Sequence, residues 1–210
     1  MPTTVTPLDK AINDFRRGGF VALLDSASRE NEADLLQAAP YVTGESINFM
    51  LTYARGLITV AMAPQRLSEL QIPVLKPQFG IENMPRFTVP ADYTPAVTTG
   101  VSAFDRAATI RALADRATRP EDFARPGHVF PLAAAARGLA ERAGHTEGAI
   151  GLAQLAGLTP VVAMCEIMAP DGHMATGATL QQFLENHSVP LVTVDQIAQA
   201  LGVGPAGTEN

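Results

Sequence analysis

Apolar residues in this chain alternate between helical spacing and short continuous runs. Ala11, Ile12 and Phe15 have the spacing of one helix face, and the Gly-Gly pair at 18–19 ends that segment. The stretch "VALLD" at 21–25 follows. A short apolar run bounded by turn residues is typical of a buried strand, so the pattern predicts a helix followed by a strand.

The same alternation continues along the rest of the chain. Ser102 followed by Asp105 indicates a capping box at one helix start, and Thr146 is the expected N-cap of another helix. Residues 72–93 are rich in proline and indicate a loop around a short strand at 86–89. Further helices are predicted from Thr43 or Ser46 to Gly56 and at 63–71, 102–115, 146–157, 179–187 and 195–202, with strands at 57–63, 159–168 and 190–194.

Alternating helices and strands predict an α+β fold, a layered α/β arrangement in which helices flank a mixed sheet. A chain of 210 residues with 47% hydrophobic residues is long enough to form one sizeable core. We therefore expect a single domain over residues 1–210, with its core at about 8–201 and a disordered tail at 202–210.

Charge and cysteine content exclude several classes of function. The net charge is −6 and the 15 Lys and Arg residues are scattered, which argues against a nucleic-acid partner. There is neither a signal peptide nor an apolar run long enough for a membrane span, so we expect a cytoplasmic protein without a membrane partner. With Cys165 as the single cysteine, a metal site would have to use oxygen and imidazole ligands.

The stretch "RENEAD" at 29–34 crowds charged residues between two apolar runs. In an extended segment, Glu30, Glu32 and Asp34 would share one face, where they repel one another unless a cation compensates. A hard divalent ion such as Mg²⁺ or Mn²⁺ prefers such oxygen ligands. The alternative is a solvated loop whose charges have no function, which is the commoner situation for charged residues.

Two further motifs contain residue types suited to chemistry. "RAGHTEG" places Arg142, His145 and Thr146 before a predicted helix, where backbone N–H groups suit a phosphate, although an exposed capped loop explains it equally well. A histidine in the position of His128, in "RPGHVFPL", is more often structural. Glu166 lies in an apolar strand, so it must pair, lie at the strand end, or have a raised pKa suited to acid–base catalysis.

In this order and at these separations, five motifs resemble the 3,4-dihydroxy-2-butanone 4-phosphate synthases of riboflavin biosynthesis. They are "RENEAD", "VTTGVSAFDRAATIRALAD", "RPGHVFPL", "RAGHTEGAIGLAQLAGL" and "CEIMAPDGHMA", and the similarity extends from about Leu8 to Ala200. The chain resembles the stand-alone form of this lyase. The resemblance implies Mg²⁺-dependent conversion of ribulose 5-phosphate to 3,4-dihydroxy-2-butanone 4-phosphate and formate by a homodimer, with active sites at the subunit interface.

The resemblance also implies roles for particular residues. The metal, Mg²⁺ or Mn²⁺, would be held by Glu30 and His145. The substrate would be contacted by Arg29, Glu30, Asp34, Arg142, Ala143, Gly144, His145 and Thr146. The family treats the positions of His128 and Glu166 as essential, and Asp25 and Glu32 match further active-site acids.

This sequence departs from the family around its substrate loops. Where the family commonly has Asp-Asp-Glu-Asp, this chain has Asp25, Ser26, Ala27 and Ser28. Thr176 replaces a family arginine, and Ala33 replaces a glycine. These changes keep two alternatives open: a paralogue that uses the same metal centre on another sugar phosphate or polyol, and a catalytically silent binding protein.

Overall fold

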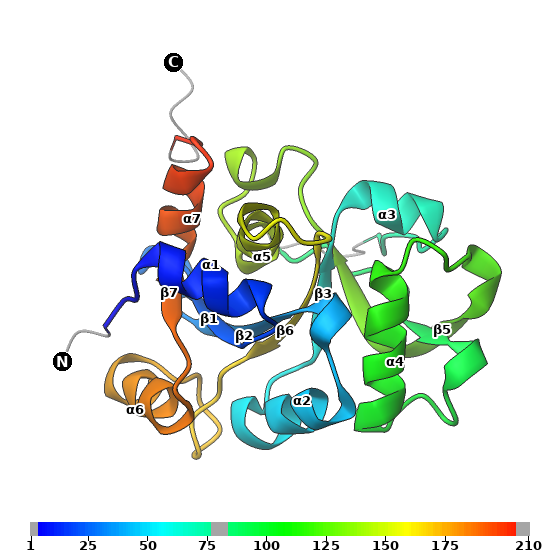
Figure 1. Cartoon of the computed structure of the whole chain (residues 1–210), viewed down its shortest axis with the longest axis horizontal. Helices are drawn as coiled ribbons and strands as arrows, with labels where there is room; N and C mark the ends of the chain where they lie inside the picture. The colour runs from blue at the N-terminus through cyan, green and yellow to red at the C-terminus, as the bar shows by residue number, and fades with distance from the viewer. Residues whose placement is uncertain (1–3, 77–83, 205–210) are drawn as a thin grey trace.

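The apolar runs form one seven-stranded sheet in the computed structural model of the chain, which describes residues 4–76 and 84–204 (Figure 1). The strands lie in the order β4-β5-β3-β6-β2-β1-β7. The β1–β7 and β3–β5 pairs are parallel and the others are antiparallel, so the predicted mixed sheet is confirmed. The strands are β1 (Val21–Leu24), β2 (Ala33–Ala38), β3 (Thr59–Met62), β4 (Ala91–Tyr93), β5 (Phe123–Ala133), β6 (Val161–Glu166) and β7 (Leu191–Thr193).

Helices cover both faces of the sheet. One face carries α1 (Leu8–Arg16), α5 (His145–Leu155) and α7 (Val194–Ala200), and the other carries α2 (Gly44–Phe49), α4 (Ala103–Ala114) and α6 (Gly177–His187) (Figure 1). A π-helical turn (Met50–Ala54) extends α2, and α3 (Pro64–Glu69) follows β3. The fold therefore has three layers, with the sheet in the middle.

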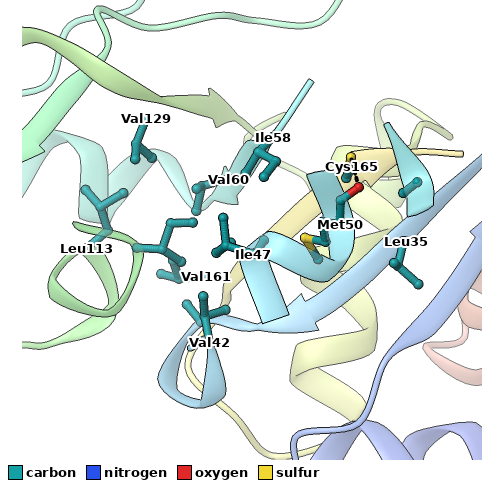
Figure 2. Close-up of a cluster of buried hydrophobic side chains, with 14 of the residues drawn as sticks. Leu35, Val42, Ile47, Met50, Ile58, Val60, Leu113, Val129, Val161 and Cys165 are labelled. Atoms are coloured by element: carbon teal, nitrogen blue, oxygen red, sulfur yellow. Dashed lines mark hydrogen bonds between the residues drawn. The ribbon is translucent and has the colours of Figure 1, made fainter. Parts of the chain in front are cut away.

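Strand β6 shows why this sequence has continuous apolar runs. Val161, Ala163 and Cys165 pack into the core on the α2 and α4 side, whereas Val162 and Met164 pack on the α5 side. Side chains of a strand alternate between faces, so a strand covered on both faces must be apolar throughout. Figure 2 shows part of the core on the α2 and α4 side of the sheet, where the Cys165 thiol lies against the Met50 carbonyl. Burial raises the pKa of this thiol to about 12, which keeps it protonated and unreactive.

The structure corrects the predicted strand at 86–89. Phe87 and Thr88 form isolated bridges, and the true strand, β4, begins at Ala91. The eleven-residue strand β5 was not predicted at all. Its two prolines, Pro126 and Pro131, are strand breakers by local rules, and pairing with β3 and β4 overrides that local signal.

One predicted helix start was wrong, and another was right except for one contact. Gly144 is the N-cap of α5, so Thr146 lies inside the helix. Ser102 does accept the backbone N–H of Asp105 at the start of α4, but the Asp105 carboxylate accepts hydrogen bonds from Thr98 and Gly100. The reciprocal half of the predicted capping box therefore does not form, because a neighbouring loop takes the carboxylate.

The chain ends add little to this architecture. Most of the predicted tail, residues 205–210, lies outside the described residues, and the single-domain extent of 1–210 stays a prediction. Across 4–76 and 84–204, none of the helices has the length and apolar character needed to cross a membrane. The expected cytoplasmic location also stays a prediction.

Candidate active site

Two carboxylates face each other across neighbouring strands on the α5 side of the sheet. Asp34 in β2 is paired in register with Glu166 in β6, and Thr59 in β3 is paired with Met164. Like charges directly opposite each other destabilise a sheet, and burial adds to the cost. A sequence that places two acids here gives up stability for a reason other than folding.

These carboxylates line a pocket of about 240 Å³. Its walls come from the ends of β2, β3, β5 and β6, the turn after β1, and the first turn of α5. Of the residues expected from the sequence, the pocket contains Arg29, Glu30, Glu32, Asp34, Arg142, His145, Thr146 and Glu166. Sequence reasoning missed Thr59, Pro85, Phe87, Leu132 and Met164, of which only Thr59, a polar residue in an apolar strand, carried a signal.

The first half of the charged stretch after β1 is a turn, so the extended arrangement considered for "RENEAD" holds only from Ala33 onward. Residues 27–30 form the turn and Asn31 has a left-handed backbone with φ 55°. The Asp25 side chain, 0% exposed, holds the turn together: it accepts the N–H groups of Glu30 at 3.2 Å and Glu32 at 3.0 Å and pairs with Arg29 at 2.7 Å. The turn still directs Glu30 and Glu32 into the pocket, beside Asp34.

Glu30 and His145 have the geometry of two metal ligands. The Nε2 atom of His145 lies 3.0 Å from the Glu32 carbonyl oxygen, to which it donates its proton because a carbonyl oxygen can only accept. In the neutral imidazole the Nδ1 atom then keeps its lone pair, and it lies 3.7 Å from Glu30 Oε2. Ligands of one octahedral Mg²⁺ at about 2.1 Å are separated by roughly 3 to 4 Å. The donor set thus fits a hard divalent cation, with a carboxylate oxygen of Asp25 within 4.8 Å of both groups.

Burial and mutual repulsion raise the pKa of two pocket acids, Asp34 and Glu32. Burial raises the pKa of Asp34 to about 6, with smaller contributions from Glu166, Glu30 and Glu32 and an opposing one from His145. Burial, followed by the charge of Glu30, raises the pKa of Glu32 as well. Such groups can exchange protons near neutral pH, and a bound cation would relieve their repulsion.

The raised pKa of Asp34 predicts a stability penalty in the metal-free protein. Asp34 favours folding below its unfolded pKa of 3.8, and that contribution disappears as the pH rises to about 6. Asp34→Asn should therefore stabilise the metal-free protein at pH 7.5 by up to about 3 kcal/mol, with a gain that shrinks towards pH 4. Urea unfolding of both proteins at several pH values checks this. A gain in stability that does not depend on pH would contradict the raised pKa of Asp34.

Glu166 lies at the end of β6, and a backbone group holds its carboxylate. The N–H of Leu57 donates to Glu166 Oε2 at 2.7 Å. Gly56 makes this approach possible, because a Cβ at position 56 would lie 2.5 Å from the same oxygen. Of the alternatives left open by the sequence, the position at the strand end is observed, and the carboxylate accepts a backbone hydrogen bond from Leu57.

The turn before α5 is part of the pocket. Gly144, His145 and Thr146 are buried, so the alternative of an exposed loop was wrong. Ala143 is exposed and does not line the pocket. The first N–H groups of α5 and the Arg142 guanidinium lie together here, an arrangement suited to an anionic group.

His128 lies apart from this pocket within one chain. It precedes Leu132 by four positions on β5, which corresponds to about 13 Å along a strand. Its Nδ1 lies 2.7 Å from the Asp92 carboxylate, which also accepts the His128 backbone N–H at 2.8 Å. The imidazole is 46% exposed. Asp92 therefore holds the ring through Nδ1, a partnership that no sequence motif revealed.

Comparison with known proteins identifies the family. The model of the 3,4-dihydroxy-2-butanone 4-phosphate synthase family matches residues 9–200. The chain belongs to this family. It is 43% identical over 198 residues to the synthase of Agrobacterium fabrum, covering 94% of this chain and 93% of that protein. It is 44% identical over 189 residues to the riboflavin biosynthesis protein RibBA of Aquifex aeolicus, covering 89% of this chain and 47% of that longer protein.

Solved synthase structures share the fold. A 3,4-dihydroxy-2-butanone 4-phosphate synthase in complex with two magnesium ions superposes with a TM-score of 0.88 at 36% identity, covering 93% of this chain and 96% of that one. The resemblance and fold class inferred from the sequence are confirmed, and the magnesium complex supports the expected metal dependence. The individual site residues stay predictions at this point.

Proposed function

We propose that this chain catalyses the reaction of its family, the Mg²⁺-dependent conversion of ribulose 5-phosphate to 3,4-dihydroxy-2-butanone 4-phosphate and formate. The observation that carries the proposal is the convergence of Glu30 and His145 in a pocket crowded with carboxylates. Membership of a synthase family supplies the reaction, and the pocket supplies residues suited to it. Mn²⁺ fits the same donor set.

The substrate would be held at the two ends of the pocket. Arg142 and the start of α5 offer positive charge and N–H groups for the phosphate. Arg29 and Asp34 offer hydrogen bonds to hydroxyl groups, with Asp25 holding Arg29 in place. Ala143 and Gly144 would contribute backbone only.

Proton transfers would be divided among several carboxylates. When bound, the divalent cation would supply positive charge that stabilises the enediolate left when the carbon next to the ketone loses a proton. Glu32, with its raised pKa, can take a proton at its carboxylate, and Glu166 faces the same space. For Asp25, whose oxygens already accept three N–H donors, the contacts support positioning of the turn, and its catalytic role stays a prediction.

We also propose that two chains form a homodimer in which His128 of each completes the pocket of the other. His128 is exposed and oriented, yet it lies on a different part of its own chain. Val101 and Phe104 follow Gly100, where an added Cβ would lie 2.5 Å from His128 Nδ1, and they are 53% and 65% exposed. Leu57, whose N–H donates to Glu166, is 45% exposed. Exposed apolar side chains at both places suit an isologous interface, where each patch of one subunit meets the other patch of its partner.

The altered loop leaves a specific competitor, a paralogue acting on another sugar phosphate. Ser26 and Ser28 replace acids and contact each other at 2.9 Å between their hydroxyl oxygens. A panel of pentose and hexose phosphates with Mg²⁺, scored for formate, distinguishes the two. Ribulose 5-phosphate should have the highest kcat/KM, and a clear preference for another sugar phosphate would favour the paralogue.

A further inference from the structure

Glu147 is a fully buried carboxylate that the proposed mechanism does not use. Its side chain is 0% exposed and lies in the first turn of α5. Glu147 Oε2 pairs with Arg142 Nη1 at 2.7 Å, and Oε1 accepts the backbone N–H of Ala135 at 2.8 Å. Two oxygens of one carboxylate thus connect α5 with the segment after β5 and with a pocket arginine.

The local backbone is built for this contact. A Cβ at position 144 would overlap the Arg142 guanidinium and lie 3.0 Å from Glu147 Oε2, so glycine lets the arginine cross the helix start. The Arg142 side chain is 14% exposed, and the residue lines the pocket. An arginine between a buried carboxylate and a pocket has a fixed guanidinium plane, because the charge-assisted bond restricts its rotamers.

We infer that Glu147 is a positioning residue that sets the orientation of Arg142 for the phosphate of the substrate. This inference rests on the proposed function, in which Arg142 binds that phosphate. Glu147 does not line the pocket, so its influence on the substrate passes through Arg142. If Glu147 only stabilised the fold, its substitution would lower the free energy of unfolding without changing the orientation of the Arg142 guanidinium.

Glu147→Gln keeps the shape and one acceptor oxygen and removes the charge. With the full-length protein and Mg²⁺, it should raise KM for ribulose 5-phosphate about tenfold and leave kcat within a factor of two, since the lost orientation affects binding. Arg142→Ala should raise KM at least as much, and the double variant should show no further increase. Additive increases would overturn the inference.

Two further variants separate positioning from general damage. Gly144→Ala should displace the guanidinium, the group that the new Cβ meets first, while keeping the Glu147 carboxylate in the chain, and so raise KM in the same way. Glu141→Gln is the matched control: this exposed glutamate in the same turn accepts the Arg137 N–H at 3.1 Å and should leave KM unchanged.

A spectroscopic measurement keeps the inference testable independently of turnover. The ¹⁵N–¹H signal of the Arg142 Nε–H, assigned through Arg142→Lys, should shift or broaden in Glu147→Gln and stay in place in Glu141→Gln. If the wild type fails to convert ribulose 5-phosphate but this signal responds, the proposed function fails and the positioning of Arg142 holds. An unchanged signal would overturn the inference whatever the activity.

Discussion

Glu30→Gln and His145→Ala should each lower Mg²⁺-dependent turnover of ribulose 5-phosphate by roughly a thousandfold, because each removes a ligand of a charge worth several kcal/mol in the transition state. The Nδ1 atom of His145 and the Glu30 carboxylate lie 3.7 Å apart, and among the described residues that line the pocket His145 is the only imidazole. Initial rates of formate release over a range of Mg²⁺ concentrations provide the measurement.

Loss of activity through misfolding has to be separated from loss of the metal. Glu30 is 44% exposed at its side chain, so the change to glutamine should leave the unfolding temperature nearly unchanged. His173→Ala and Glu121→Gln are matched controls, because their side chains are 86% and 67% exposed and lie outside the pocket. A folded Glu30→Gln or His145→Ala protein with unchanged turnover would remove that residue from the metal assignment.

A heterodimer of two inactive variants should regain about half of the wild-type activity, because one of its two sites is intact. In a dimer of His128→Ala and His145→Ala chains, the His128→Ala subunit keeps its own His145 and receives the partner's His128. The pocket of the His145→Ala subunit lacks both histidines. Co-expression with two different affinity tags isolates the mixed dimer, and its kcat per dimer is compared with both homodimers.

The result depends on which chain supplies the histidine. If His128 served the pocket of its own chain, both subunits of the mixed dimer would carry a defect and the activity would stay at the homodimer level. Wild-type dimer that carries the same two tags is the control, because it gives the full activity with which the mixed dimer is compared. A chain that stays monomeric at working concentration while fully active would also contradict the interface.

The sequence predicted most of the fold because patterns of apolar residues report burial directly. β6 is apolar from Val161 to Cys165 since helices cover both of its faces, and Ser102 marks the start of α4 by its hydroxyl group. β5 was missed because pairing partners far along the chain, in β3 and β4, decide its conformation. Local propensity has no access to those partners.

The site was predicted in composition but not in geometry. The motif residues named Glu30, Glu32, Asp34 and His145, yet no motif indicated that the Glu32 carbonyl sets the tautomer of His145. Asp92 and Glu147 escaped notice because each acts through a neighbour, His128 or Arg142. Residues that orient others depend on tertiary contacts and leave little trace in a single sequence.

The most direct test of the central claim is the stoichiometry of the reaction of the purified wild-type protein with ribulose 5-phosphate. Product analysis by NMR with Mg²⁺ present should find formate and 3,4-dihydroxy-2-butanone 4-phosphate in equal amounts. Both should disappear in excess EDTA and return when Mg²⁺ is restored. Consumption of the sugar phosphate without formate, or no consumption by protein shown to bind the metal, would contradict the account.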